Sequence, residues 1–251
     1  MERITSRRNP ICVHMKRLGE SRGYRQEHGQ FLCDGIKLLE EAVQSGVEVM
    51  AVLTASEIPY PLLVETRVYH CDRNIVDSVS PLKSSTGPVF TCSMPRERNP
   101  ITSEGTHILL DSLQDPGNIG AIIRTADAFG IKSVIMSKMC ADAYNPKAIR
   151  ASMGAIFRQE IHVMELAELE KLKYIGFRII GAEAGEIQRD ISGVPLQNSI
   201  VAIGNEGNGL SMDVRSLCDE MVTIPISHKC ESLNAAVAAA IVMWEAAKQN
   251  K

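Results

Sequence analysis

Residues 107–136 read HILLDSLQDPGNIGAIIRTADAFGIKSVIM, and this stretch decides the fold class of the C-terminal half. Short apolar runs over 107–110 and 133–136 predict two strands. Between them Asn118 can cap a helix, and Gly130 lies just beyond its end. The apolar face of that helix carries Ile119, Ile122, Ile123 and Ala126. A strand, a helix and a second strand in this order predict parallel pairing.

The alternation of strands and helices continues to the C-terminus. Asn145 and Pro146 predict a helix start, because asparagine caps helices and proline suits the first helical position. The face of this helix is expected to carry Ile149, Ser152, Met153 and Ile156. Further strands are expected at 177–182, 200–203 and 221–226, with a terminal helix at 233–247. The sequence therefore predicts an α/β fold whose mainly parallel sheet is covered by helices on both faces.

The N-terminal part has a similar but weaker alternation. Strands are expected at 31–33, 47–53, 67–71 and 88–92, with a helix from Ile36 that Gly46 closes. A first helix is expected within residues 4–19, with Ile11, Met15 and Leu18 facing inward. The polar segment MPRERNPITSEG (94–105) contains two prolines and lacks apolar periodicity. We therefore expect a small α/β domain at 1–95, a linker at 96–105 and a larger domain at 106–251.

The aromatic content and the charge distribution of the chain limit how it could bind nucleic acid. Aromatic residues make up 4% of the chain, which argues against a platform that stacks many unpaired bases. The net charge is −3, but residues 1–25 carry seven cations against two carboxylates. The cations are Arg3, Arg7, Arg8, Lys16, Arg17, Arg22 and Arg25. This basic arm can neutralise phosphates, although a solvated terminal helix explains it equally well.

The cysteines bear on metal binding and location. Seven cysteines are scattered without a CxxC pair, which argues against a disulfide framework and against a zinc site. Reduced thiols and a cytoplasmic location are therefore expected. The sequence shows neither a signal peptide nor an apolar run that would span a bilayer, so no membrane association is expected.

Three loops at the ends of predicted strands carry the chemistry, because ligands of open parallel sheets bind at the carboxyl ends of strands. The first loop begins at Asp111 and leads into the helix after Asn118. Arg124 lies beside the apolar stripe of this helix, where its guanidinium could reach a phosphate or a reacting oxygen. A plain helix cap at Asn118 and a surface charge at Arg124 are the alternative.

The second loop, IVAIGNEGNGLS (200–211), runs from an apolar strand into Gly204, Gly207 and Gly209. Glycines allow positive φ and a close approach of the backbone to a ligand. The spacing differs from the dinucleotide fingerprint GxGxxG. Glu206 would repel a pyrophosphate and suits a neutral or cationic ligand such as a sulfonium. A generic tight turn is the alternative.

The third loop, IPISHKCESLNAAVA (224–238), leads from a strand into an alanine-rich helix that lets a neighbouring backbone pack closely. Ser232 and Asn234 are polar groups at the mouth of that helix. Helix capping by Ser232 is the alternative.

Together the three segments resemble the three motifs of the SpoU (TrmH-like) family of RNA 2′-O-ribose methyltransferases, within the SPOUT superfamily. The matching stretches are DPGNIGAIIRTADAFG (115–130), IGNEGNGLS (203–211) and IPISHKCESLNAAVAAAI (224–241). RASMGAIF (150–157) is similar to the segment between the first two motifs. The resemblance covers roughly 106–250, and the N-terminal part more loosely resembles a small L30e-like RNA-binding domain.

The resemblance implies a deep trefoil knot in which S-adenosylmethionine is held largely by backbone groups. It also implies a homodimer whose active site is completed near the interface. No metal is expected, because the cysteines are scattered without a CxxC pair. Carried over by motif, the cofactor contacts fall on Gly204, Asn205, Gly207, Ile224, Ile226, Ser232 and Leu233.

The family's key arginine falls on Arg124, which the resemblance implies to lie at the target ribose and its phosphate. Arginine is scarcely ever deprotonated in proteins, so orienting the phosphate and stabilising the developing alkoxide is the role we favour over that of a base. Asn118, Glu206, Ser232 and Asn234 fall on the surrounding polar positions and are expected to support it. His228 stands where the family often has glycine, and we expect it to point to solvent.

The sequence therefore predicts methylation of a ribose 2′-hydroxyl in structured RNA. Ribosomal RNA is favoured because the N-terminal domain with its basic start resembles those of enzymes that modify ribosomal RNA. A transfer-RNA methyltransferase and a non-catalytic RNA-binding protein on the same scaffold remain alternatives. A nucleotide-dependent oxidoreductase is a remote one, because the glycine spacing is wrong.

Overall fold

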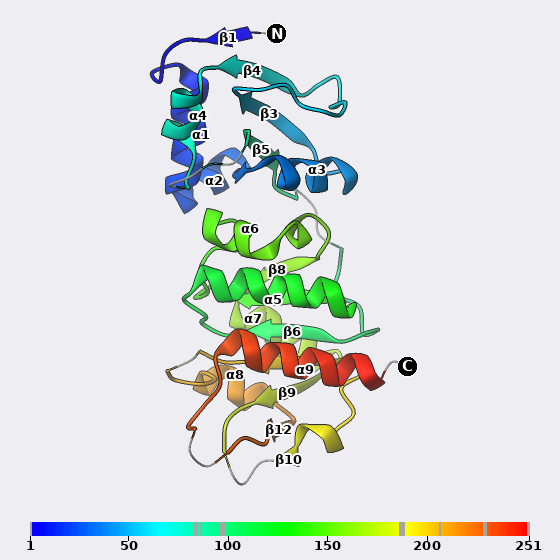
Figure 1. The fold of residues 1–251 in the computed structure, drawn as a ribbon. Helices are drawn as coiled ribbons and strands as arrows, with labels where there is room; N and C mark the ends of the chain where they lie inside the picture. Colours follow the sequence, from blue (N-terminus) through cyan, green and yellow to red (C-terminus); the bar gives the residue numbers. More distant parts are fainter. Residues whose placement is uncertain are drawn as a thin grey trace. The chain divides into compact units, whose positions relative to one another are not determined.

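The structure is a computed structural model that describes residues 2–82, 85, 87–95, 99–185, 189–205, 207–227 and 230–249. The chain divides into two compact units (Figure 1). The first unit comprises Met1–Glu97 and Asp142–Arg158, and the second comprises Arg98–Ala141 and Gln159–Lys251. The predicted boundaries differ, because they place residues 142–158 with the C-terminal domain.

The first unit is a five-stranded sheet with helices, in the order β1-β4-β3-β5-β2. Strand β5 is antiparallel to both of its neighbours, and the other pairings are parallel. The strands are β1 (Glu2–Ile4), β2 (Gln30–Asp34), β3 (Val49–Thr54), β4 (Arg67–Cys71) and β5 (Val89–Ser93). The helices are α1 (Pro10–Glu20), α2 (Arg22–His28), α3 (Ile36–Gln44), α4 (Arg73–Val79), α6 (Pro146–Ser152) and the 3₁₀ turn η1 (Ala155–Phe157). The small α/β domain expected here is thus present.

The first helix begins later than the sequence pattern predicts. Residues 2–4 form β1, and the Asn9 side chain accepts a hydrogen bond from the Ile11 amide to start α1 at Pro10. Asparagine as cap with proline at the first position favours this start over one at residue 4. Cys12 is buried together with Met15 and Leu18, whereas Ile11 is only half-buried.

Arg25 is buried rather than part of an exposed basic arm. Its side chain is 2% exposed, and Nε and Nη2 donate to the Asp142 carboxylate at 2.8 and 2.6 Å. Two hydrogen bonds from one guanidinium satisfy a charge that would otherwise be costly to bury. Phe31 contacts Tyr144 and Phe157 with ring centroids 4.8 and 6.2 Å apart, so residues 142–158 form part of the core of this unit.

The face predicted for helix α6 is wrong at two positions, because the helix ends at Ser152 and Ile156 lies in the separate 3₁₀ turn η1. Met153 ends the helix in a left-handed conformation with φ of 49° and is exposed, while Ile149 and Ser152 are buried. The left-handed residue turns the chain away from the helix, so Met153 does not share their face.

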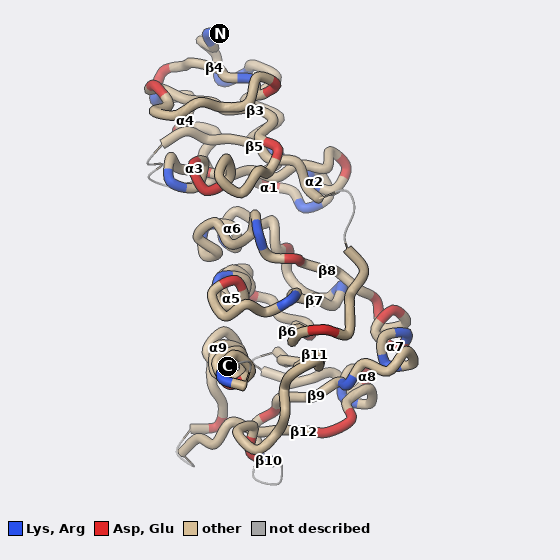
Figure 2. Tube along the Cα trace, turned by 90° about the vertical axis from the view of Figure 1, so that its right-hand side faces the viewer, with Lys and Arg blue, Asp and Glu red and all other residues tan. Residues whose placement is uncertain are grey.

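The second unit is a seven-stranded sheet in the order β10-β12-β9-β11-β6-β7-β8, and every pairing between its described strands is parallel. Helices α5 and α9 lie on one face, and α7 and α8 on the other (Figure 2). The strands are β6 (His107–Leu110), β7 (Ser133–Ser137), β8 (Ile161–Met164), β9 (Arg178–Ala182), β10 (Arg189–Asp190), β11 (Ser199–Ile203) and β12 (Glu220–Thr223). The helices are α5 (Pro116–Phe129), α7 (Leu166–Tyr174), η2 (Ile191–Gly193), α8 (Met212–Leu217) and α9 (Ala235–Gln249). The predicted parallel sheet with two covered faces is confirmed.

Two helix starts differ from the expected ones, and capping explains both. Asp115 accepts a hydrogen bond from the Gly117 amide at 2.7 Å, so α5 begins at Pro116 and Asn118 does not cap it. Asn234 accepts from the Ala236 amide at 3.0 Å and starts α9 at Ala235, so the cap is not Ser232. Asn118 therefore lies within the first turn of α5, and Ser232 lies before the start of α9.

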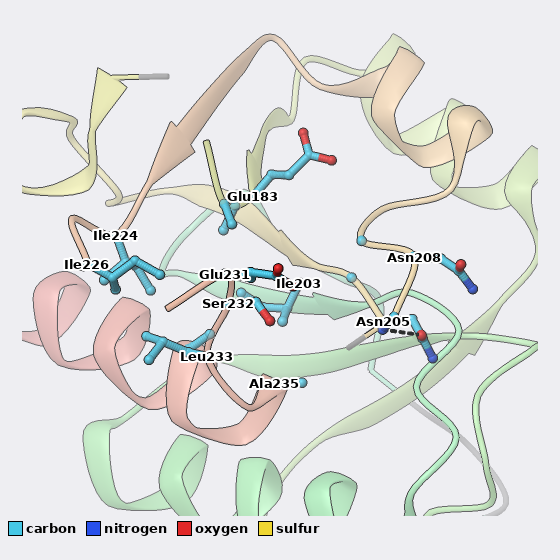
Figure 3. Close-up of a pocket in the computed structure, with 16 residues that line it drawn as sticks. Glu183, Ile203, Asn205, Asn208, Ile224, Ile226, Glu231, Ser232, Leu233 and Ala235 are labelled. Carbon is cyan, nitrogen blue, oxygen red and sulfur yellow. Dashed lines mark hydrogen bonds between the residues drawn. The ribbon is translucent and has the colours of Figure 1, made fainter. Parts of the chain in front are cut away.

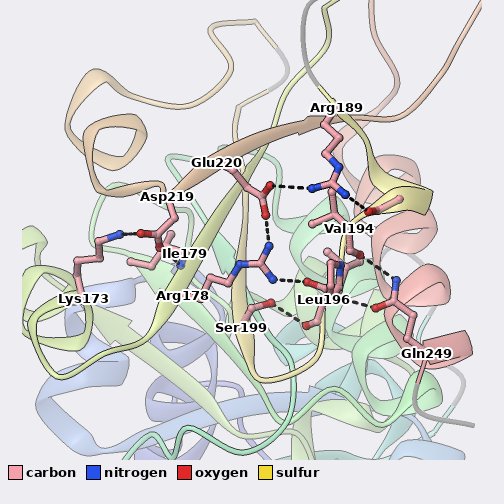
Figure 4. A network of polar contacts seen from close by, with 12 residues as sticks. Lys173, Arg178, Ile179, Arg189, Val194, Leu196, Ser199, Asp219, Glu220 and Gln249 are labelled. Carbon is pink, nitrogen blue, oxygen red and sulfur yellow. Dashed lines mark hydrogen bonds and ion pairs between the residues drawn. The ribbon is translucent and has the colours of Figure 1, made fainter.

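Strand β12 ends at Thr223, three residues before the predicted end. Ile224 and Ile226 therefore lie in the following loop, where Pro225 cannot donate to a sheet ladder. Ion pairs hold this edge of the sheet together, because Glu220 on β12 pairs with Arg178 on β9 and with Arg189 on β10 (Figure 4). They fix the strand from which the third loop departs.

The amino ends of β6 and β7 contain a buried histidine. His107 is 1% exposed, and its Nε2 donates to the Thr102 carbonyl at 2.9 Å. Nδ1 therefore accepts from the Ser133 hydroxyl at 2.8 Å, which fixes the neutral tautomer. Burial is the main reason that the pKa of His107 lies below its ordinary value of 6.5.

We expect the free energy of unfolding to fall as the pH drops below about 6.5. In that range the unfolded chain binds a proton that folded His107 does not take up, and the loss continues down to the pKa of the folded state. Urea unfolding at pH 7.5, 6.5 and 5.5 measures this, with His107→Gln as the non-titrating variant. The variant should show a shallower decline below pH 6.5, and an equal decline in both proteins would contradict the assignment.

Candidate active site

A cavity of about 390 Å³ opens at the carboxyl ends of the neighbouring strands β12, β9 and β11 (Figure 3). Its wall comes from the segment after β9, the glycine loop after β11, the loop after β12 and the first turn of α9. Residues that are more than fifty positions apart in the chain therefore meet around one space. This is the edge at which open parallel sheets bind ligands.

The cavity is lined by every residue that the resemblance marks as a cofactor contact. These are Gly204, Asn205, Gly207, Ile224, Ile226, Ser232 and Leu233. Glu183 and Glu231 also line it, although neither was predicted from the sequence as a site residue. The predicted strand at 177–182 could have pointed to Glu183, because the residue after that strand falls at the same carboxyl edge.

The glycine loop after β11 closes tightly on itself. The amide of Asn205 donates to the Gly209 carbonyl at 2.9 Å, and the Gly209 amide donates back to the Asn205 carbonyl at 2.9 Å. A Cβ at Gly204 would lie 2.1–2.3 Å from backbone atoms of Gly209 and Leu210, which no real Cβ tolerates. Position 204 thus requires glycine for space, and Gly209 requires it for its φ of +65°.

Asp111 and Ser112 connect the first loop to the glycine loop. Asp111, at the end of β6, is buried and accepts a hydrogen bond from the Ser211 amide at 2.7 Å. The Asn205 side chain donates to the Ser112 carbonyl at 3.0 Å. These two bonds hold both ends of the glycine loop against the end of the neighbouring strand.

The first and third loops meet at a pair of asparagines. Asn234 Nδ2 donates to Asn118 Oδ1 at 3.3 Å, while Asn234 Oδ1 caps α9. Helices α5 and α9 pack along one another, so this bond joins their N-terminal ends (Figure 1). The structure thus brings Asn118, Asn234 and the cavity residue Ser232 into one region.

Arg124 is placed differently. It lies two turns along α5 from Asn118, is exposed, and has neither an ion pair nor a hydrogen bond with any residue that the structure describes. It does not line the cavity. Two other expected residues, Glu206 and His228, lie outside the described residues.

The charge of the cavity suits a cation. Among the described residues that line it, Glu183 and Glu231 are acidic and none is basic. The Glu183 carboxylate accepts from Arg215 at 2.6 Å, which holds it beside the glycine loop. No group of three His, Cys, Asp or Glu residues that could hold a metal occurs in the described part of the chain. Within the same part, no helix is long and apolar enough to cross a membrane.

Comparisons with known proteins agree with this arrangement. Residues 105–244 match the model of the SpoU rRNA Methylase family, and residues 9–88 match that of the MRM3-like substrate binding domain. A 23S rRNA (guanosine(2553)-2′-O)-methyltransferase of Bacillus subtilis is 31% identical over 97% of this chain and 98% of its own length. A 23S rRNA (uridine(2479)-2′-O)-methyltransferase of Streptomyces viridochromogenes is 32% identical over 98% of this chain and 92% of its own length.

Solved structures of SpoU and TrmH-family proteins have the same fold as this chain. The SpoU methyltransferase AviRb from Streptomyces viridochromogenes, in complex with AdoMet, superimposes with a TM-score of 0.86 at 28% identity, covering 97% of this chain and 98% of that one. A TrmH-family RNA methyltransferase structure from Porphyromonas gingivalis gives a TM-score of 0.85 at 28% identity over 95% and 97%. The family match spans more than half of the chain and includes most of the unit that carries the cavity, together with residues 142–158 of the first unit. This chain belongs to the SpoU rRNA methylase family.

Proposed function

We propose that this protein transfers the methyl group of S-adenosylmethionine to a ribose 2′-hydroxyl of ribosomal RNA. The observation that carries the proposal is the cavity in which the glycine loop, the loop after β12 and the start of α9 converge. Two full-length relatives are named as 23S rRNA 2′-O-methyltransferases, and both support ribosomal RNA over transfer RNA.

The residues of the cavity fit this cofactor. No basic residue is among the described lining residues, and although Arg215 pairs with Glu183, the carboxylate of Glu231 still favours a cationic sulfonium over an anion. The backbone amides of Ile226 and Leu233 make no hydrogen bond with any described residue, so they are available as donors for a nucleoside. Glu183 and Glu231 can accept hydrogen bonds from hydroxyl or ammonium groups. When bound, the cofactor supplies an electrophilic methyl group on sulfur.

The asparagine pair at the ends of α5 and α9 holds the polar side of the site. Asn118 and Asn234 fix one another and leave Ser232 at the rim of the cavity. We assign to these three residues, together with Glu206, the support of the loops and contact with the nucleotide. Holding the 2′-oxygen in line with its electrophile contributes much of the rate in such transfers.

We assign to Arg124 the binding of the phosphate beside the target ribose and the stabilisation of the developing alkoxide. An exposed guanidinium without a partner in the described part of the chain is available for a phosphate. Its charge lowers the energy of a negative oxygen, and it keeps its proton throughout. The proton of the 2′-hydroxyl therefore leaves to another acceptor.

We further propose that the protein is a homodimer in which α9 contributes to the interface. Val237 and Trp244 lie two turns apart on one side of α9, and they are 48% and 52% exposed. Trp244 also contacts Phe129 of α5 with ring centroids 5.7 Å apart. An exposed apolar strip of this kind is typical of a contact surface.

The seven cysteines support a cytoplasmic location. All are free thiols in the structure, and five of them are buried. Free thiols persist in reducing compartments.

Replacing Gly204 by alanine should weaken S-adenosylmethionine binding at least about tenfold, because the new Cβ forces the glycine loop open. Isothermal calorimetry with the full-length protein measures this. Gly193→Ala is the matched control, since its Cβ would approach nothing closer than 3.9 Å and it lies outside the cavity. Unchanged affinity in the Gly204 variant would contradict the assignment of the cavity.

Arg124→Ala should lower methyl transfer to ribosomal RNA by about 10² or more, the usual cost of removing one group that stabilises a transition state. The melting temperature and the cofactor affinity should not change, because Arg124 is exposed and does not line the cavity. Tritium transfer from labelled cofactor measures the rate. A variant that retains full activity would show that Arg124 has no role in the reaction.

Trp244→Glu should convert the protein to a monomer, because it introduces a charge into the apolar strip of α9. Light scattering after gel filtration gives the mass. Tyr174→Glu is the matched control, since Tyr174 is also an exposed aromatic residue, 91% exposed, but lies at the end of α7, on the other face of the sheet. A dimer in the Trp244 variant would place the interface elsewhere.

A further inference from the structure

A second cavity lies entirely within the first unit, between α1 and one end of the sheet. Its volume is about 520 Å³, within the range of about 300–1,000 Å³ in which small ligands bind. The reaction assigned to the second unit does not use it. Its lining includes His14 and Ile11 from α1, Gln30 from β2, Thr91 from β5 and Tyr69 from β4.

Thr91 has an unsatisfied hydroxyl at this cavity. The residue is 1% exposed, and its Oγ1 makes no hydrogen bond with any residue that the structure describes. A buried polar group without a partner costs about 1–3 kcal/mol, so such groups are rare in native proteins. Since Thr91 lines the cavity, a ligand there can supply the missing partner.

Gln30 presents a second polar group to the same space. His14 Nε2 lies 3.1 Å from Gln30 Oε1, and His14 Nδ1 lies 2.9 Å from the Tyr24 hydroxyl. The glutamine oxygen only accepts, so Nε2 carries the proton and Nδ1 accepts from the tyrosine. This arrangement leaves the Gln30 amide nitrogen as a donor without a partner in the described part of the chain.

Gln30 and Thr91 face the same side of the sheet. In the antiparallel pairing of β2 with β5, Gln30 lies opposite Ser93 and Leu32 lies opposite Thr91. Paired residues, and residues two apart on a strand, share a face. The amide and the hydroxyl are therefore diagonal neighbours, close enough to contact one planar group.

The surrounding charges favour a base over a phosphate. Glu48 and Glu65 line the cavity together with one cation, Arg67, so the lining keeps a net negative charge that disfavours a phosphate inside it. The rings of His14 and Tyr69 and the chain of Met50 offer flat and apolar surface instead. Unstacked bases of RNA bind to surfaces of this kind, with polar groups at their edges.

A cation lies within reach of the adjoining phosphate. Arg17 follows His14 by three positions on α1, so both lie on the same side of the helix. Its guanidinium carbon is 3.9 Å from the centre of the Tyr24 ring, the ring whose hydroxyl contacts His14. A chain whose base enters the cavity would pass its phosphate near Arg17.

We propose that this cavity binds one unpaired base of the RNA substrate, with the Gln30 amide and the Thr91 hydroxyl contacting its polar edge. The proposal rests on the proposed function, because it takes its ligand to be the RNA that is methylated. It assigns to the first unit the recognition of a single extruded nucleotide.

The test compares Thr91→Val and Gln30→Met with the wild type in binding to protein-free ribosomal RNA from cells that lack the gene. Both variants should weaken RNA binding about tenfold, which is typical of a lost base contact. The dependence of affinity on salt should not change, since no phosphate contact is lost. Arg17→Gln should instead reduce the salt slope by about 1.

The melting temperatures of the variants show whether Thr91 acts in RNA binding or only in stabilising the fold. Thr91→Val removes a hydroxyl that has no partner, so the melting temperature should stay equal or rise. Thr54→Val is the matched control: Thr54 is also 1% exposed, but its hydroxyl donates to the Ser56 carbonyl at 2.8 Å. This control should lose stability and keep its RNA affinity.

RNA affinity equal to wild type in both cavity variants would overturn the proposal while leaving the proposed function intact. A wild-type protein that neither binds nor methylates this RNA would overturn the proposed function and, with it, the assignment of the cavity. Weaker binding by the Thr91 variant together with a lower melting temperature would also overturn it, because the loss would then follow from damage to the fold.

Discussion

The site depends on the contact between Gly204 and the backbone of Gly209 and Leu210. There is no room for a side chain at this point, so the chain after β11 can fold back within six residues. That turn places Asn205, Gly207, Asn208 and Gly209 along one wall of the cavity. The carboxylate of Asp111 and the carbonyl of Ser112 then hold the turn against β6. Two adjacent strands thereby fix a loop that has little apolar packing of its own.

The opposite wall depends on α9. Its alanines allow it to lie close to α5, and the asparagine pair joins the starts of the two helices. The same asparagine that binds Asn118 also caps α9, so one side chain sets both where the helix begins and where it sits. The residues just before this cap, Ser232 and Leu233, are thus held at the cavity.

Much of the second unit could be predicted because its apolar runs are long and separated by helices. The strands at 107–110 and 200–203 and the parallel sheet came from periodicity alone, and the seven residues marked by the resemblance all line one cavity. Helix starts were less predictable, since Asp115 competes with Asn118, and Asn234 with Ser232, for the same capping role. The edge strand β10 has two residues and no apolar pattern. Burial of Arg25 could not be foreseen, because its carboxylate partner is 117 positions away.

Residues 142–158 belong to the first unit, although the chain on both sides of them belongs to the second. The chain leaves the first unit near residue 98, re-enters it at Asp142 and leaves again after Arg158. A fragment that ends where the match to the substrate binding domain ends, at residue 88, would leave the buried guanidinium of Arg25 without Asp142. It would also remove the contacts of Phe31 with Tyr144 and Phe157. An N-terminal fragment without residues 142–158 is therefore not expected to fold on its own. Any circularly permuted or spliced chain would have to keep this segment with the first unit.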